Sequence, residues 1–552
     1  MEARRGQPDI QRGEEAIPIE DRSEPESQAS KVGDGPSPAP QSMISRLGAG
    51  AILLLVTVSI LWPRLSRPEW QGTEGRRVQI AHEMLESGDW LVPSLNGEPT
   101  LTKPPFYYWV LAGSESLFGF GRLQARVPSV IGFWLFAWFA LEVLRRRFGS
   151  LAGWIGAVGV LTAPSITYHG GYAEIDPMFS ALCGASLLGL GVGLAERSRP
   201  RILIAGALGA LAMLTKGPPY FLFFAGALLV WVRHCRAFAL HWFLLVLLTP
   251  ILIWVFVLAE RVGGISSLLE LWKSETVGRA AGYGWKHVLL GVPFVLGAFA
   301  QVLPLGLWTF WEHRGAREAR VNGSEVILRI CSASAISGVL LLLLSTGRPA
   351  RYLMPGLLVF CTAVAPAVAA YASLRRPPSR WQASIPRVVG ALAAIALFVL
   401  PWLRSPLPGS SFWWALIIAL LGLRVRTRPQ LVAYALLVPA LLPWTALNDR
   451  VERSTRGVRS AHEVAVALRA EVRRLGIDEG ELAFFGHVPN DVMLHADLLE
   501  VFGDEFRARV PKTRWIIHEA TWNDQDAPLD RYRCRARVRA HKRTLVLSER
   551  ID

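Results

Sequence analysis

The sequence predicts an all-α polytopic membrane protein with about thirteen transmembrane helices, followed by a small C-terminal extracytoplasmic α/β domain. Of the 552 residues, 51% are hydrophobic and 19% are charged, whereas about a quarter of an average soluble domain is charged. Uncharged runs long enough to cross the hydrocarbon layer recur from Ile52 to Leu447. Arginine clusters alternate with these runs, as they do in multi-span proteins.

Residues 1–44 are predicted to form a disordered cytoplasmic tail. The stretch is rich in Pro, Glu, Ser, Gly and Arg and has few long apolar side chains with which to build a core. We do not interpret it as a signal peptide, because the apolar run near Ile52 begins far from the first residue and no small-residue cleavage site follows it.

Residues 45–447 are predicted to form one transmembrane domain, whose orientation follows from its arginines. By the positive-inside rule, the arginine-bearing loops lie in the cytoplasm. Their arginines are Arg145, Arg146, Arg147, Arg197, Arg199, Arg201, Arg233, Arg236, Arg314, Arg317, Arg320, Arg375, Arg376, Arg380, Arg424, Arg426 and Arg428. The N-terminus is then cytoplasmic, and the expected location is the bacterial inner membrane. Two spans meet at Lys216 with little length to spare, so a re-entrant pair between Ile202 and Val232 is an alternative.

The net charge of +15 is explained by this topology and by attraction to anionic lipid, so no nucleic-acid partner is expected. Four of the five cysteines lie in or beside apolar runs, and no disulfide framework is predicted. His487, Asp491 and His495 are interpreted as surface and turn residues rather than as metal ligands.

Residues 448–552 are predicted to form the soluble α/β domain. The segment "SAHEVAVALRAEVRRLGI" has helical periodicity, and "ELAFFGHV", "RWIIHEA" and "RTLVLSE" have the composition of short strands. About a hundred residues can bury a modest core.

The first outer loop, residues 64–126, is predicted to contain an amphipathic helix on the membrane surface. Its apolar residues recur near helical spacing within "EGRRVQIAHEMLESGDW"; they are Val78, Ile80, Ala81, Met84 and Leu85. The following "KPPFYYW" carries aromatic residues that suit the membrane interface.

Ionisable side chains gather at the predicted outer ends of the spans. Asp176 lies just inside one span, where a carboxylate is costly unless it serves a site. Several cations lie at other outer ends or loops, among them Lys103, Lys216, Arg279, Arg348 and Arg351. Fixed cations at this level suit a phosphate-bearing lipid.

Six short motifs in this order resemble those of the GT-C glycosyltransferases related to lipid A aminoarabinose transferases and protein O-mannosyltransferases. They are "TEGRRVQIAHEMLESGDWLVP", "TKPPFYYW", "AEIDPMF", "LTKGPP", "ETVGR" and "GRPARYLMP". The resemblance extends from about Arg46 through the last span. It implies an enzyme that moves a sugar, with inversion, from a polyprenyl-phosphate donor to an extracytoplasmic acceptor, which is a lipid, glycan or protein.

The resemblance also implies roles for individual residues. Glu74 and Asp176 match catalytic carboxylates, and the donor phosphate would contact the cations Lys103, Lys216, Arg279 and Arg348. Thr73 stands where the family usually has an Asp that acts as base. Thr102 stands where the aminoarabinose transferases have a metal-binding Glu, so no metal ligand is assigned, although a divalent metal is left open.

The chemistry of such a transfer agrees with this set of residues. Cations must hold the departing phosphate, and a carboxylate must steady the charge on the sugar or accept a proton, which Thr73 cannot do near neutral pH. Two alternatives are a non-catalytic relative that keeps the lipid site, which Thr73 favours, and a transporter. A transporter would be expected to place charges near the bilayer midplane instead of at span ends.

Overall fold

The structure is a computed structural model. It describes residues 43–67, 70–71, 73–95, 98–100, 103–270, 272, 294, 296–298, 301, 324–343, 349–374, 377–380, 382–389, 391, 409–455, 461–477, 482–484, 507–508, 515–519, 532–540 and 543–550. The predicted phosphate ligands Arg279 and Arg348 lie outside these ranges, as do Thr102 and the group of His487, Asp491 and His495.

A mostly helical segment, predicted to be the first outer loop, follows the first long helix, α1 (Met43–Leu65). It contains α2 (Glu74–Ser87), a short antiparallel pair of β1 (Ser94–Leu95) and β2 (Glu98–Pro99), and α3 (Phe106–Phe118). The predicted amphipathic helix is thus present as α2. Its apolar side buries Val78, Ile80, Ala81 and Met84 against Tyr107 and its neighbours on α3. Gly88 ends the helix at φ 70°, a left-handed conformation that glycine adopts without strain.

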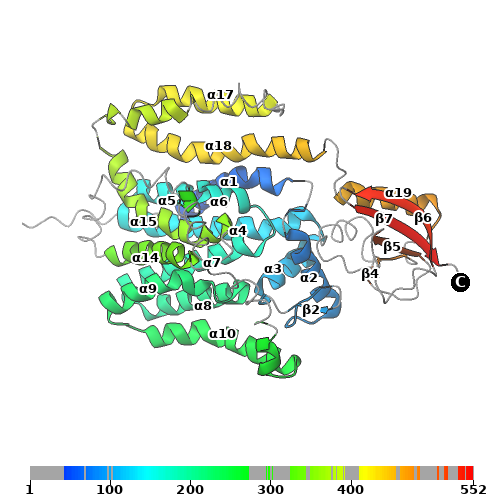
Figure 1. The fold of residues 1–552 in the computed structure, drawn as a ribbon. Helices are drawn as coiled ribbons and strands as arrows, with labels where there is room; N and C mark the ends of the chain where they lie inside the picture. Colours follow the sequence, from blue (N-terminus) through cyan, green and yellow to red (C-terminus); the bar gives the residue numbers. More distant parts are fainter. Residues whose placement is uncertain are drawn as a thin grey trace, which may run out of the picture. The chain divides into compact units, whose positions relative to one another are not determined.

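The membrane part consists of apolar helices of different lengths, together with the short helices α6 and η1 (Figure 1). They are α4 (Arg122–Phe148), α5 (Ser150–Thr162), α6 (Pro164–His169), α7 (Ile175–Ala195), α8 (Arg199–Lys216), α9 (Tyr220–Cys235), α10 (Leu240–Arg261), α14 (Glu325–Leu342), η1 (Ala350–Leu353), α15 (Met354–Ala372), α17 (Gly409–Arg424) and α18 (Arg428–Thr455). Within the described ranges, six segments are long and apolar enough to cross a membrane: Ser45–Leu65, Arg122–Phe148, Ile175–Ala195, Leu240–Arg261, Glu325–Leu342 and Ala350–Ala372. The multi-span fold class is confirmed, and the total of about thirteen spans stays a prediction.

Helix α7 lies at the centre of this part, packed against α4, α8, α14 and α15. Of its most apolar stretch 72% is buried, against 33% for α10, whose Leu252, Ile253 and Phe256 are exposed. Small residues let the central helices approach closely: a Cβ on Gly191 of α7 would lie 3.1 Å from the Cα of Ile327 on α14. Thus α7 is held by protein on several sides, and α10 presents apolar side chains suited to lipid.

The junction at Lys216 consists of two separate helices. Helix α8 ends at Lys216, Gly217 follows at φ 83°, and α9 begins after Pro218 and Pro219. The glycine makes the turn and the two prolines stop α8 from continuing. Figure 1 shows α8, α9, α10 and α14 side by side, and the contacts join α8 to α10 and α9 to α14.

The C-terminal part contains α19 (Ala461–Arg474) and a mixed five-stranded sheet of order β4-β3-β5-β7-β6. The strands are β3 (Leu482–Phe484), β4 (Arg507–Ala508), β5 (Trp515–Glu519), β6 (Tyr532–Ala540) and β7 (Arg543–Arg550). Strand β3 pairs in parallel with β4 and β5, whereas β7 pairs antiparallel with β5 and β6. The helix and the strands expected from the sequence are present as α19, β3, β5 and β7. The division into domains at residue 447 stays a prediction.

Candidate functional site

The centre of the candidate site is Asp176, where the N-terminal end of α7, the C-terminal end of α8 and η1 meet. Its carboxylate is in direct contact with Lys216 Nζ, and Oδ2 lies 2.9 Å from Arg351 Nε in an ion pair not aligned as a hydrogen bond. The Asp176 and Lys216 side chains are 11% and 10% exposed, whereas Arg351 is 31% exposed. Asp176 is in the first turn of α7 and Lys216 in the last turn of α8, so each helix dipole favours the charge at its end.

Aromatic rings surround these charges. The Nζ of Lys216 lies 3.9 Å from the ring centre of Tyr352 and 5.4 Å from that of Phe179, within range of cation–π attraction. On α6, Tyr168 and His169 pack edge to face. Burial and the positive charges of Arg351 and Arg64 lower the pKa of His169 to about 4, although the negative charge of Asp176 acts in the opposite direction. The imidazole is therefore neutral near pH 7, and His169 adds no fixed charge to the site.

Glu74, which the sequence analysis selected as catalytic, is completely buried at the start of α2. Its Oε1 accepts hydrogen bonds from Arg126 Nε at 2.9 Å and from the Ala173 amide at 2.6 Å. Its Oε2 accepts from Arg126 Nη2 and from the Gln71 amide, both at 2.7 Å. The catalytic role of Glu74 stays a prediction, and this geometry favours a role in holding the start of α2 against α4 and the Ala173 amide.

Glu174, which the sequence analysis did not select, lies beside Asp176 in the motif "AEIDP". It is 3% exposed, and its Oε1 accepts a hydrogen bond from the Thr73 amide at 3.3 Å. Its Oε2 is buried without a hydrogen-bond partner among the described residues. The signal in the sequence that could have indicated this position is a pair of carboxylates separated by one residue before an apolar run.

The pKa of Glu174 is raised, mainly by burial. The negative charges of Asp176 and Glu74 raise this pKa further. The positive charge of Arg351 and the hydrogen bond from the Thr73 amide lower it. These groups come from α2 and the residue before it, from α7 and from η1. Thr73 stands where the resembling family usually has an Asp. In this structure the Glu174 carboxylate, from another part of the chain, is hydrogen-bonded to the Thr73 amide.

The loop that carries Lys103 reaches the loop that follows Lys216. A Cβ on Gly217 would lie 4.0 Å from Pro104 Cγ, and Lys103 itself is partly buried. The loop at Pro104 and the turn at Gly217 thus lie close together, and their location on the outer face stays a prediction. Of the six predicted site residues, the structure describes Glu74, Lys103, Asp176 and Lys216.

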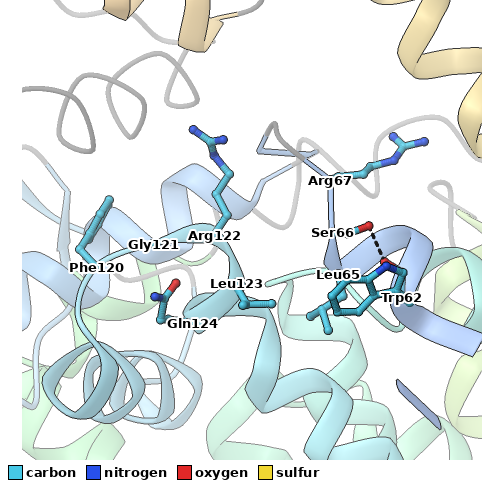
Figure 2. Close-up of a pocket in the computed structure, with 9 residues that line it drawn as sticks. All are labelled: Trp62, Leu65, Ser66, Arg67, Phe120, Gly121, Arg122, Leu123 and Gln124. Carbon is cyan, nitrogen blue, oxygen red and sulfur yellow. Dashed lines mark hydrogen bonds between the residues drawn. The ribbon is translucent and has the colours of Figure 1, made fainter. Parts of the chain in front are cut away.

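A hollow of about 420 Å³ lies between the end of α1 and the start of α4 (Figure 2). It is lined by Trp62, Leu65, Ser66, Arg67, Phe120, Gly121, Arg122, Leu123 and Gln124. Figure 2 shows the guanidinium groups of Arg67 and Arg122 extending away from the apolar side chains of Trp62 and Leu65. The combination of arginine with tryptophan and leucine suits the polar head and the first methylenes of a membrane lipid.

No group of three His, Cys, Asp or Glu side chains placed to hold a metal ion occurs in the part of the chain that the structure describes. The three neighbouring carboxylates at positions 74, 174 and 176 have arginine, lysine or backbone amides around them instead. These three carboxylates, with the partners that the described residues give them, therefore do not fit a metal centre.

Comparison with known proteins gives matches in both sequence and fold. The family model described as dolichyl-phosphate-mannose-protein mannosyltransferase matches residues 102–259. Two curated relatives from Pseudomonas fluorescens and Yersinia enterocolitica are named undecaprenyl phosphate-alpha-4-amino-4-deoxy-L-arabinose arabinosyl transferases. They are 30% identical over 181 residues and 33% identical over 180 residues. The matches cover 32% and 31% of this chain and 31% and 32% of the relatives, so the chain spans about a third of the length of the curated relatives it matches.

The fold match extends over nearly the whole chain. The crystal structure of ArnT from Cupriavidus metallidurans bound to undecaprenyl phosphate superposes with a TM-score of 0.63 at 19% identity, covering 91% of this chain and 97% of that one. The apo state of the same protein matches with the same TM-score and 18% identity. At 19% identity, the structural similarity to ArnT shows the fold alone. The matches in sequence to the curated relatives cover a shorter segment, about 180 residues of this chain. Together these findings show that the chain has the ArnT fold and that residues within it are similar in sequence to the aminoarabinose transferases and to the mannosyltransferase family model.

Proposed function

We propose that this multi-pass membrane protein is a glycosyltransferase that moves a sugar from a polyprenyl-phosphate donor to an extracytoplasmic acceptor with inversion. The observation that carries the proposal is the buried group of Asp176, Lys216 and Arg351 at the ends of three elements. A partly open arginine and a buried lysine beside a carboxylate suit a substrate that combines an anionic phosphate with a sugar that becomes positively charged. The names of the curated relatives support the same class of donor.

In this mechanism an oxygen of the acceptor attacks the anomeric carbon from the side opposite the phosphate. The bond from that carbon to the phosphate oxygen breaks, and the polyprenyl phosphate leaves with the electron pair. Lys216, with Lys103, Arg279 and Arg348 as the further predicted contacts, would stabilise the leaving phosphate. Asp176 would keep Lys216 and Arg351 in position and steady the positive charge that develops on the sugar.

A non-catalytic relative that keeps the lipid site is the second candidate, and the observation in its favour is Thr73. Mass spectrometry of lipid-linked products from cells with and without the protein separates the two. A transferase leaves an acceptor that is heavier by one sugar in cells that contain the protein. Identical acceptor masses in the two strains would support the non-catalytic candidate.

Replacing Arg279 or Arg348 with alanine is expected to weaken donor binding, because each arginine is proposed to make a charge-assisted contact with the donor phosphate. Each lost contact should cost about 1.5 to 3 kcal/mol, a roughly tenfold to 150-fold increase in Kd. The measurement is binding of a polyprenyl-phosphate sugar to the purified variants. Arg261→Ala, at an exposed surface ion pair, serves as the control and should bind the donor as the wild type does. Unchanged affinity in both test variants would remove these arginines from the site.

The proposed orientation predicts which cysteines react with an impermeant reagent in intact cells. A single cysteine at position 198 should be protected, whereas one at position 410 should react, because the arginine-rich loops are proposed to lie in the cytoplasm. The native Cys534, which is exposed, reports on the C-terminal part. Reaction of Cys534 only after permeabilisation would reverse the proposed side of the site.

A further inference from the structure

We propose that Glu174 is the group that takes the proton from a hydroxyl acceptor in the reaction proposed above. This inference rests on the proposed function and assigns one further catalytic residue to it. The neighbouring Thr73 has a hydroxyl but cannot accept a proton near neutral pH.

The Glu174 carboxylate is buried, and one of its two oxygens has no hydrogen-bond partner among the described residues. The residue is 97% buried, because only 3% of its surface is exposed. One oxygen, Oε1, accepts the Thr73 amide, while Oε2 has no hydrogen-bond partner in the part of the chain that the structure describes. A buried carboxylate oxygen without a donor is costly, so such an atom is retained where a ligand supplies the donor. An acceptor hydroxyl is a donor of this kind.

The two neighbouring carboxylates, Glu74 and Asp176, differ from Glu174 because both of their oxygens have partners. Both oxygens of Glu74 accept from Arg126 and from backbone amides. The two oxygens of Asp176 face Lys216 and Arg351. Glu174 has no ion pair of this kind among the described residues and keeps one oxygen available. Of the three, it is the carboxylate best arranged to receive a proton.

The burial of Glu174 and the charges around it change the basicity of its carboxylate. Burial of Glu174 and the negative charges of Asp176 and Glu74 raise its pKa, while Arg351 and the Thr73 amide hold the increase back. A carboxylate with a raised pKa is a stronger base than one in water. The ionised form is the active one, so the rate should rise as the pH increases through this raised pKa and then reach a plateau.

In the proposed step the acceptor oxygen forms a bond with the anomeric carbon while its proton passes to Oε2 of Glu174. The bond between that carbon and the phosphate oxygen breaks, and the polyprenyl phosphate carries the electron pair away. Glu174 later releases the proton to water, which restores the carboxylate. The step involves no change of oxidation state, so it requires no oxidant or reductant.

The test compares full-length wild type, Glu174→Gln and Glu174→Asp, with Glu260→Gln as a control at an exposed carboxylate. Turnover with a neutral alcohol acceptor should fall about 10²-fold in Glu174→Gln and much less in Glu174→Asp, which keeps a carboxyl group. Donor Kd should stay within about threefold of the wild type, because the phosphate contacts are made by other residues. The increase of rate with pH should be present in the wild type and absent in Glu174→Gln.

Full-rate transfer to the alcohol by folded Glu174→Gln would overturn the assignment, as would a reduced rate that keeps the wild-type pH dependence. If Glu174→Gln fails to fold, a wild-type rate that does not change between pH 4 and 8 overturns it instead. Absence of transfer by the wild type to any acceptor counts against the proposed function itself. The two failures are therefore distinct.

Discussion

Asp176→Asn is expected to lower turnover by about 10²- to 10⁴-fold with little change in donor binding. Asparagine keeps the size of the side chain but removes the negative charge that neutralises Lys216 and Arg351. The two cations can still attract a phosphate, so the donor still binds. They lose the group that fixes their positions, and the sugar loses the carboxylate that steadies its developing positive charge. Single-turnover rates and donor Kd, measured on the same preparation, separate the two effects.

The control for this variant is Asp89→Asn. Asp89 forms an ion pair with Arg261 at 3.0 Å, but the pair is open to solvent: Arg261 is 55% exposed and Asp89, which is half-buried, is 34% exposed. Exposed pairs of this kind contribute about 0 to 1 kcal/mol, so turnover should match that of the wild type. A loss in Asp176→Asn that comes entirely from weaker donor binding would show that Asp176 only shapes the phosphate site.

Glu74→Gln is expected to destabilise the protein by about 3 to 5 kcal/mol, the cost of leaving a buried charge without its partner. Four donors converge on the Glu74 carboxylate, two from Arg126 and two from the backbone amides of Gln71 and Ala173. A glutamine has one acceptor oxygen and an amino group that would face donors. Chemical unfolding in detergent micelles gives the change in the free energy of unfolding.

Glu86→Gln is the matched control, because Glu86 is an exposed residue on the same helix and should change stability by no more than about 0.5 kcal/mol. The double variant Glu74→Met with Arg126→Met removes both buried charges and should recover much of the loss. A Glu74→Gln protein that is as stable as the wild type but inactive would instead support the original catalytic prediction for Glu74.

The sequence was sufficient for features that depend on local periodicity. Helix α2 follows from the spacing of Val78, Ala81 and Met84, and the end of α8 follows from glycine and proline after Lys216. Strand β6 was not predicted, because its residues "YRCRARVRA" alternate arginine with small and apolar residues and show little of the usual strand composition. The identification of this strand depends on its pairing with β7.

The sequence predicted only those features of the site that follow from the position of a residue within its own span. A carboxylate at the start of a span and a lysine at the end of another can be expected to meet, and Asp176 and Lys216 do. The partner of Glu74 could not be inferred, since Arg126 lies 52 residues away near the N-terminal end of α4, a long apolar helix. Glu174 was missed because its significance depends on what surrounds it, namely the Thr73 amide on one oxygen and nothing described on the other.

Arg126 also links the residues that follow α1 to a helix that is synthesised later. Its guanidinium group donates to the carbonyl oxygens of Leu65 and Arg67 at the end of α1, at 3.3 and 2.6 Å, and to Glu74 at the start of α2. All of these acceptors leave the ribosome before Arg126 does. Until α4 has been made, Glu74 therefore lacks both guanidinium donors and can accept only from earlier groups such as the Gln71 amide, while the Ala173 amide is synthesised later still. Protease sensitivity of this segment in nascent chains should consequently decrease when α4 is complete and decrease again when Ala173 has followed.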